Sequence, residues 1–482
     1  MNITVESGEG QINNKIIVIG AGISGLTTAY LLNKLGYDIT VIEKKKEPGG
    51  SIETVVEKGF LFDKGPNSAL ETHPLIGQII EELDLNEQLV YASKEANKRY
   101  ILKNNQLHAL PLSPPAFFKT KLFSPAAKLR LLAEPFFGRS KDGYYQSISD
   151  FVTRRLGREF LDYAINPFVA GVYAGNPEEL SVKSAFPKLY ELEEKYGGLI
   201  IGTIRSIKER KKRAEKSKQS AKMLSFRDGM QILPNAIAKH LGNKVKFQCD
   251  VTSIKKNNGG FQINYMREGE PQVIDCDKII STVPAFAASK LFAHFDEGLT
   301  KHLNEIYYPP VLVLYLAYKK SAVGQPLDGF GFLIPSKEKK SFLGAIWSSI
   351  IFPNRIINGE TAEDKTVFTL FVGGARNPEI GSIDKEILIG KVRKEFEQIM
   401  KISDEPVFQT YKYWSKAIPQ YNIGYIEHDR YFDEFEKKNP GIFLSGNYRG
   451  GISVGDCIKS SEALCQKLIN NSQFIINNLG AK

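Results

Sequence analysis

Cysteine is scarce in this sequence, with four residues among 482. They stand at positions 249, 276, 457 and 465, without a CxxC pair or any other spacing typical of metal ligands, and the six histidines are scattered along the chain. We therefore predict no metal site and no redox dithiol, and we expect a reducing compartment on the cytosolic side.

Long apolar runs are also missing, since none approaches the roughly 18 residues that a membrane-spanning helix requires. The first residues, MNITVESGEGQINN, are polar and lack the basic and apolar regions of a signal peptide. We expect neither a transmembrane helix nor a signal peptide, so that any association with a membrane is peripheral.

The net charge of +10 favours an anionic ligand, an anionic membrane surface or nucleic acid, without choosing among them. The most basic run, Ser206 to Lys222, contains no aromatic residue that could stack on a base. A solvated linker or helix is the preferred interpretation of this run, and no nucleic-acid partner is predicted. A non-catalytic module that binds membranes or nucleic acid is the alternative that charge alone would allow.

The strongest pattern lies between Lys15 and Glu43. An apolar run, KIIVI, is followed at once by GAGISG, then by apolar residues at helical spacing and a second β-type run that ends in Glu43. Gly20 allows a tight turn, Gly22 admits a pyrophosphate at the helix N-terminus, and Gly25 permits close packing of helix on strand. Glu43 stands where a carboxylate accepts hydrogen bonds from ribose hydroxyls. The segment predicts a dinucleotide site and disfavours NADP.

A second glycine-rich turn occurs near the other end of the chain, where Gly441 to Leu444 leads into SGNYRGGISVGD and the final helix. A loop with paired glycines, Gly49-Gly50, follows the first unit and can present further backbone amides to a phosphate. This arrangement resembles the FAD-binding, amine-oxidase-like flavoproteins. The family usually has basic residues on both sides of the paired glycines, whereas this chain has Glu47 and Ser51 there.

Five further segments, in the family's order, narrow the resemblance to the oxygen-dependent protoporphyrinogen oxidases. They are NKRYI from Asn97, NPFVAGVYAG from Asn166, GLIIGTIR from Gly198, FVGGARN from Phe371 and YWSKA from Tyr413. The resemblance implies a mixed α/β fold with a discontinuous Rossmann-like FAD-binding domain, an antiparallel-sheet substrate domain and a helical membrane-docking insertion. The expected boundaries are 12–90, 222–290 and 441–482 for the first domain, 91–110, 195–221 and 291–440 for the second, and 111–194 for the third.

For the cofactor, the resemblance implies contacts from both glycine turns and from the segments that close over them. The expected residues are Gly20, Ala21, Gly22, Ile23, Ser24, Gly25, Glu43, Lys44, Gly49, Gly50, Ser51, Gly65, Pro66, Asn67, Ser68, Val251, Trp414, Gly446, Ile452, Ser453 and Val454.

For the substrate, the resemblance implies that three apolar residues sandwich a tetrapyrrole and that Arg99 pairs with a propionate. The expected substrate contacts are Arg99, Asn67, Gly175, Leu333, Ile346 and Phe371. No side chain is predicted to act as a catalytic acid or base. From the residues alone, the apolar trio could equally belong to the core and Arg99 could be a surface cation.

The stretch from Leu110 to Arg139 combines prolines, five phenylalanines and basic residues. Aromatic side chains among cations are typical of a membrane interface, and in the family this insertion docks on a membrane. An internal helical core is the alternative. Beyond it, Phe151 to Phe168 is predicted to be a helix that ends near Pro167.

The implied activity is FAD-dependent oxidation of protoporphyrinogen IX to protoporphyrin IX, the penultimate step of haem synthesis, with O2 as acceptor and H2O2 as product. The implied partners are the tetrapyrrole, O2, a membrane surface on the cytoplasmic side of a bacterial inner membrane, ferrochelatase as recipient of the product, and a second copy in a homodimer. Oxidation of coproporphyrinogen III to coproporphyrin III is the main alternative, because it uses the same fold and cofactor. Its substrate has four propionates instead of two, so its cavity should contain more cations. An amine oxidase or a desaturase is a more distant alternative.

Overall fold

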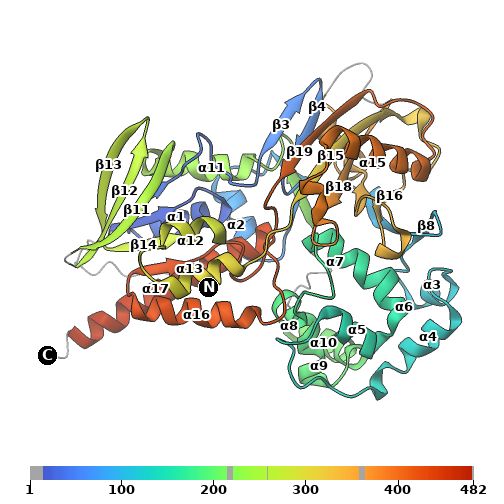
Figure 1. Cartoon of the computed structure of the whole chain (residues 1–482), viewed down its shortest axis with the longest axis horizontal. Helices are drawn as coiled ribbons and strands as arrows, with labels where there is room; N and C mark the ends of the chain where they lie inside the picture. The colour runs from blue at the N-terminus through green and yellow to red at the C-terminus, as the bar shows by residue number, and fades with distance from the viewer. Residues whose placement is uncertain (1–14, 214–220, 258, 358–363, 480–482) are drawn as a thin grey trace.

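The computed structural model describes residues 15–213, 221–257, 259–357 and 364–479 (Figure 1). The N-terminal segment on which the signal-peptide prediction depends, and part of the basic run that begins at Ser206, lie outside the described residues. The chain forms a nucleotide-type α/β part, a seven-stranded sheet and a group of short helices. In Figure 1 these lie on the left, at the upper right and at the lower right, respectively.

A parallel five-stranded sheet organises the first part. Its order is β10 (Val245–Lys246), β2 (Asp38–Ile42), β1 (Lys15–Ile19), β14 (Lys278–Ser281) and β20 (Ile442–Leu444). Side chains alternate along β1, so Ile16 and Val18 join one core cluster while Ile17 and Ile19 join another. The predicted strand–turn–helix–strand unit is confirmed, and the sheet brings chain segments from both ends of the sequence together.

Different layers cover the two faces of this sheet. The first cluster contains residues of α1 (Ile23–Lys34), α2 (Pro74–Glu82), α11 (Ile232–Leu241) and α17 (Val454–Leu479). The second contains residues of the antiparallel sheet β11 (Cys249–Asn257), β12 (Gly260–Arg267) and β13 (Glu270–Cys276), and of α12 (Ala285–Leu291), α13 (Glu297–Glu305) and α16 (Tyr425–Lys438). Within this antiparallel sheet, β12 and β13 form a hairpin.

Short strands connect this part to the rest of the molecule. One hairpin pairs β3 (Thr54–Glu57) with β4 (Phe60–Asp63), and a small sheet has the order β5 (Ala69–Leu70), β9 (Met223–Phe226), β6 (Leu89–Tyr91). Phe60 and Phe62 of β4 pack against Phe408. The hairpin therefore carries the chain from the nucleotide part onto the seven-stranded sheet.

The seven-stranded sheet is antiparallel except where β16 runs parallel to β7. Its order is β19 (Phe408–Trp414), β15 (Val311–Lys319), β18 (Lys365–Gly373), β17 (Gly344–Ile346), β16 (Gly329–Leu333), β7 (Lys98–Lys103) and β8 (Gln106–Ala109). One face packs on α15 (Lys385–Met400) in a fully buried cluster around Phe368 and Phe396. The other face is turned toward β4 and the helical part. The antiparallel sheet that the resemblance implied is confirmed.

Short helices build the third part. They are α3 (Pro114–Lys119), α4 (Pro125–Leu132), α5 (Ile148–Leu156), α6 (Arg158–Phe160), α7 (Asn166–Tyr173), α8 (Val182–Ala185), α9 (Pro187–Tyr196) and α10 (Leu199–Arg213). Arg155 is fully buried among them and pairs with Glu134 at 3.1 Å and Glu193 at 2.6 Å. Both Glu134 oxygens also accept hydrogen bonds from the first amides of α10, Leu199 N and Ile200 N. A buried ionic network therefore fixes the start of α10.

The helix predicted from Phe151 to Phe168 is wrong in its boundaries. Gly157, with φ of +91°, ends α5, and the chain then passes through α6 and a π-turn into α7. Pro167 lies in the first turn of α7, where its missing N–H is not needed, so the helix begins there and does not end. Among the residues described, no helix is both long enough and apolar enough to cross a membrane.

Candidate active site

The first glycine turn leaves the N-terminus of α1 open to a ligand. Gly22 precedes the helix in an extended conformation, and no side chain caps the first turn. A Cβ on Gly25 would lie 1.9 Å from the Gly20 carbonyl oxygen, so only glycine permits this approach of helix and strand. By contrast, the nearest atom to a Cβ on Gly22 is 4.0 Å away. Free N–H groups beside open space suit the pyrophosphate of a dinucleotide.

The paired glycines lie directly against this turn. Gly49 N donates to Ala21 O at 2.8 Å, and a Cβ on Gly50 would stand 3.2 Å from the Cα of Gly22. The next loop is equally close, because a Cβ on Gly65 would lie 1.9 Å from the Ser51 carbonyl. The structure thus brings together three segments predicted to bind the cofactor, in a cradle that side chains would fill.

Glu43 is 8% exposed at the end of β2. Its Oε2 accepts from Ala21 N at 2.6 Å and its Oε1 from Lys45 N at 2.8 Å. A carboxylate has about four acceptor positions, so these two bonds hold the group in place and leave capacity for ribose hydroxyls. Lys44, predicted beside it, instead pairs with Asp250 at 2.8 Å on the surface.

Hydrogen bonds to the side chain of Tyr421 fix the second glycine turn. Tyr421 Oη donates to Asn447 O at 2.8 Å and accepts from Gly451 N at 3.0 Å. Ser453 then caps α17 by accepting from Asp456 N at 3.1 Å. Helix α17 packs along α1, with Ser461 Oγ donating to Ser24 O at 3.0 Å. Both glycine turns therefore belong to one rigid pair of helices.

The remaining predicted cofactor residues occupy varied environments. Ala21, Ile23, Ser24 and Val454 are buried, Gly446 has a φ of +120°, and Val251 stands at a bulge in β11. Ile452 packs against the core, while Pro66 and Ser68 are half-buried in the loop that contains Asn67. Trp414 Nε1 donates to Lys64 O at 2.8 Å, which ties β19 to the end of β4.

The predicted apolar trio shares one face of the seven-stranded sheet. Leu333 pairs with Gly344, which in turn pairs with Phe371, so their side chains point the same way. Ile346 lies two residues beyond Gly344 and therefore on that face too. All three side chains are half-buried. A Cβ on Gly344 would meet the Phe332 carbonyl at 2.5 Å, so this position stays without a side chain between Leu333 and Phe371.

Arg99 belongs to the same face through its register with Gly331, the partner of Ile346. Its guanidinium carbon lies 5.3 Å from the ring centre of Phe330, and its side chain is exposed. Among the described residues, no carboxylate lies within ion-pair distance of Arg99. The group is a cation available to an external carboxylate.

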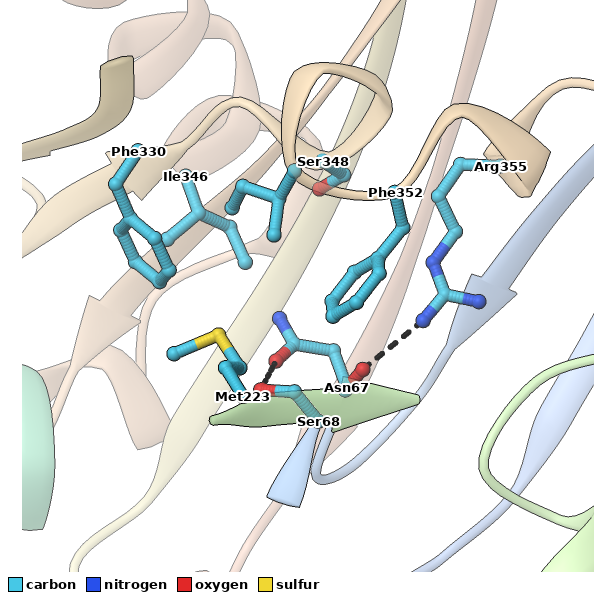
Figure 2. A pocket seen from close by; sticks show the side chains of 9 residues that line it. Asn67, Ser68, Met223, Phe330, Ile346, Ser348, Phe352 and Arg355 are labelled. Carbon is cyan, nitrogen blue, oxygen red and sulfur yellow. Dashed lines mark hydrogen bonds between the residues drawn. The ribbon is translucent and has the colours of Figure 1, made fainter. Parts of the chain in front are cut away.

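Phe330 and Ile346 line a cavity together with Asn67 (Figure 2). The other lining residues are Ser68, Met223, Ser348, Ile351, Phe352 and Arg355. The cavity lies between the loop after β4 and the strands β16 and β17 (Figure 2). It therefore joins the predicted cofactor loop to the predicted substrate face.

Arg355 and Asp63 are functional candidates that the sequence did not reveal. Arg355 Nη2 donates to Asp63 Oδ2 at 2.7 Å and to Ser225 Oγ at 2.9 Å. It also donates to Asn67 O at 2.9 Å (Figure 2). Burial raises the pKa of Asp63, and the Arg355 guanidinium opposes that rise. The pair holds the Asn67 loop against the sheet. Sequence gave no signal, since the two residues are 292 positions apart.

Gly175 does not line this cavity. It is buried at the end of α7, where a Cβ would lie 2.7 Å from Gln420 Oε1 and 2.8 Å from Leu180 Cδ1. Neighbouring Gly171 does approach the substrate face, because a Cβ there would be 2.7 Å from Leu333 Cδ2. Helix α7 therefore approaches Leu333 at Gly171, and substrate contact by Gly175 stays a prediction.

A separate apolar groove opens on the helical part. It is lined by Pro111, Leu112, Ser113, Pro114, Phe117, Phe118, Leu131, Leu132 and Ile200. Phe136 nearby is 89% exposed, whereas Phe123 is buried against Phe160. The phenylalanines of this insertion therefore divide between a small core and an exposed apolar surface.

Comparison with known proteins adds a family and a set of relatives. The model of the family "Flavin containing amine oxidoreductase" matches residues 23–469. The chain is 34% identical to protoporphyrinogen oxidase 2, chloroplastic/mitochondrial, of Arabidopsis thaliana, over 92% of each chain. It is 26% identical to the coproporphyrinogen III oxidase of Bacillus subtilis, covering 93% of this chain and 96% of that protein. A candidate protoporphyrinogen oxidase of known structure from Exiguobacterium sp. 255-15 has the same fold, with a TM-score of 0.77, 21% identity and coverage of 95% and 99%.

Proposed function

Because the chain belongs to the flavin-containing amine oxidoreductase family, we propose that it oxidises protoporphyrinogen IX to protoporphyrin IX in haem synthesis. The protein is an oxidoreductase and its cofactor is FAD. The cradle formed by the two glycine turns and the Gly49-Gly50 loop fits a dinucleotide, because its N–H groups and open space match a pyrophosphate.

The observation that carries the substrate proposal is the composition of the open sheet face. Leu333, Ile346 and Phe371 form a half-buried apolar surface beside the cofactor loop, with Arg99 at its edge. A flat apolar macrocycle with carboxylate side chains matches this combination, since apolar side chains cover the rings while a guanidinium forms a bidentate pair with a carboxylate. Arg99 is the cation that stands next to Ile346 on this face, and a single guanidinium there favours a substrate with few carboxylates.

Bound FAD would supply the two-electron acceptor for hydrogen from the methylene bridges of the tetrapyrrole, three times per substrate, with O2 as the final acceptor and H2O2 as the product. The residues of this chain bind, orient and shield the substrate. Arg355 is the only charged residue among those that line the cavity, and its guanidinium already holds Asp63 and Asn67. We assign no general base, and the rate enhancement comes from positioning and from exclusion of water.

The test compares aerobic oxidation of protoporphyrinogen IX and coproporphyrinogen III by the FAD-loaded protein, followed by porphyrin fluorescence. We expect a larger kcat/KM for protoporphyrinogen IX. Arg99→Leu should lower that kcat/KM about tenfold, the loss of one charge-assisted contact. Lys98→Gln is the matched control, since it removes a neighbouring cation on the opposite side of β7, where Lys98 pairs with Asp328. Preference for coproporphyrinogen III would overturn the substrate assignment and keep the fold and cofactor.

The apolar groove of the helical part supports a second part of the proposal, peripheral docking on a membrane that supplies the apolar substrate. Its exposed side chains, Leu112, Phe118 and Leu132, stand near the exposed cations Lys119 and Lys121. Flotation with vesicles that contain anionic lipid should carry the protein upward. Phe118→Ser with Leu132→Ser should abolish flotation and preserve the flavin spectrum, and unchanged flotation would contradict docking by this groove. The homodimer and transfer of product to ferrochelatase stay predictions.

A further inference from the structure

Two helices of the nucleotide part bring together three side chains that can ligate a metal ion. His302 and Glu305 lie on α13, and His428 lies on α16. One ligand atom from each is within 4.8 Å of the others. From the sequence we predicted no metal site, because 126 positions separate the two histidines and no spacing links them. In Figure 1 these two helices lie side by side.

The two imidazoles face each other through the same ring atom. His302 Nδ1 and His428 Nδ1 are 2.9 Å apart. In a tetrahedral zinc site with Zn–N bonds of 2.0–2.1 Å, two nitrogens stand about 3.3 Å apart. A shift of a few tenths of an ångström therefore converts the hydrogen-bonded pair into two ligands. The ring that donates in the present pair moves its proton to its own Nε2 on binding.

Glu305 supplies the third ligand from the same face of α13. It is three residues beyond His302, a spacing that places side chains next to each other on a helix. The carboxylate is exposed, and among the described residues its ion pair is with Lys301 at 3.9 Å, a surface contact of little strength. Its free χ angles let the oxygen close the remaining distance to the imidazoles.

Surrounding aromatic residues hold the two imidazoles in orientation. The His302 ring stacks on Tyr431 with ring centres 4.4 Å apart, and His428 meets Tyr425 edge-on at 5.4 Å. Tyr431 Oη donates to Asp296 Oδ1 at 2.6 Å, and that oxygen also caps α13 by accepting from Leu299 N. This aromatic packing restricts the orientations that the two imidazole rings can take.

We propose that His302, Glu305 and His428 form a binding site for a divalent transition metal, with Zn²⁺ the expected ion and a water completing the tetrahedron. Two imidazoles and a carboxylate suit Zn²⁺, whereas Mg²⁺ and Ca²⁺ prefer oxygen ligands alone. Bound metal would connect α13 to α16 and stabilise this layer of the nucleotide part. The proposal is independent of the substrate assignment above.

The experiment titrates Zn²⁺ into the full-length, FAD-loaded protein without an affinity tag, in competition with a chelating dye. We expect one Zn²⁺ per chain and a rise in Tm with Zn²⁺. H302N and H428N should each lower the affinity at least tenfold, and E305Q by less. H73N is the matched control, since His73 Nε2 lies 3.5 Å from a carboxylate oxygen of Glu462 without a second imidazole among the described residues nearby.

Equal affinity in wild type and in the H302N/H428N double variant would overturn the proposal, and so would an equal loss in H73N. The flavin absorbance of each variant verifies that it has folded. Cu²⁺ bound in place of Zn²⁺ provides a second readout, because nitrogen hyperfine coupling in its EPR spectrum should indicate two imidazoles in the wild type. Coupling to no imidazole at all would also overturn the site.

Discussion

On β18, Phe368, Leu370 and Val372 face α15 and are fully buried, whereas Phe371 faces the other side and is half-buried. The two faces carry similar apolar side chains. They differ in what covers them, because a long helix fills one face while the other is covered only in part by β4 and α7. An apolar residue on the second face can therefore contact a ligand. Composition alone could not decide between ligand contact and core packing for Leu333, Ile346 and Phe371.

Truncation on the covered face should have the largest effect on stability. Phe368→Ala removes a ring that packs edge-on against Phe396 with ring centres 5.0 Å apart, and it leaves a cavity that the sheet cannot close. We expect a loss of about 3 to 5 kcal/mol in the free energy of unfolding. Urea unfolding measures it, and the KM of the folded fraction should be unchanged. A changed KM with intact stability would remove the distinction between the faces.

The second prediction concerns Arg355, which lies where the covered part of the second face borders the cavity. Arg355→Met would leave the Asp63 carboxylate buried without its cation, at a cost of about 3 kcal/mol near pH 7. Burial raises the folded-state pKa of Asp63 above its unfolded value, so the variant should regain stability as the pH falls and the carboxyl becomes neutral. Thermal unfolding across pH measures this recovery.

The double variant D63N/R355M serves as the control for that charge. Removing both charges should cost less than removing Arg355 alone, because no buried carboxylate stays unpaired. If the double variant lost as much free energy of unfolding as D63N and R355M lose together, the two residues would act independently. Loosening of the Asn67 loop should appear separately, as weaker FAD retention.

Phe371→Ala is the partner experiment to Phe368→Ala on the same strand. Its half-buried ring has less surrounding structure to lose, so we expect less than half of the stability loss of Phe368→Ala. Its effect should appear in kcat/KM for protoporphyrinogen IX, which we expect to fall about tenfold, or about 1.4 kcal/mol. A large stability loss without a kinetic effect would assign Phe371 to the core.

The sequence predicted the nucleotide part well because its signals are local. A tight turn, a helix N-terminus and a close helix–strand contact each require glycine at one position, and Gly20 and Gly25 satisfy conditions visible within a few residues. The Asp63–Arg355 pair and the His302–His428 pair arise from contacts across more than a hundred positions. Neither residue type nor spacing indicates such a contact before the chain is folded.

The boundaries of the helix predicted from Phe151 to Phe168 were wrong because they, too, depend on contacts that form only in the folded chain. A proline starts or ends a helix according to which backbone N–H groups lack partners, and Pro167 occupies a first turn because Gly157 had already ended the preceding helix. Likewise, apolar residues of β18 point to both faces of the sheet, so the sequence of the strand does not indicate which face is covered. Which face stays open depends on where α15 packs, and that placement is set by the whole fold.

The smallest expected loss of stability is at Glu82, on the exposed edge between α1 and α2. Burial alone would raise the pKa of Glu82, but hydrogen bonds from Lys34, Tyr30 and Gln78 outweigh it and lower the pKa to about 2 from 4.5. Because the folded-state pKa is depressed, the stabilisation is present above pH 4.5 and disappears as the pH falls toward 2. Glu82→Gln should therefore cost less than about 1 kcal/mol at pH 7, since the pair is exposed to solvent. Urea unfolding at pH 7 and at the lowest pH where the protein stays folded should give a difference that shrinks with acid. A difference that grew would show that Glu82 acts by packing.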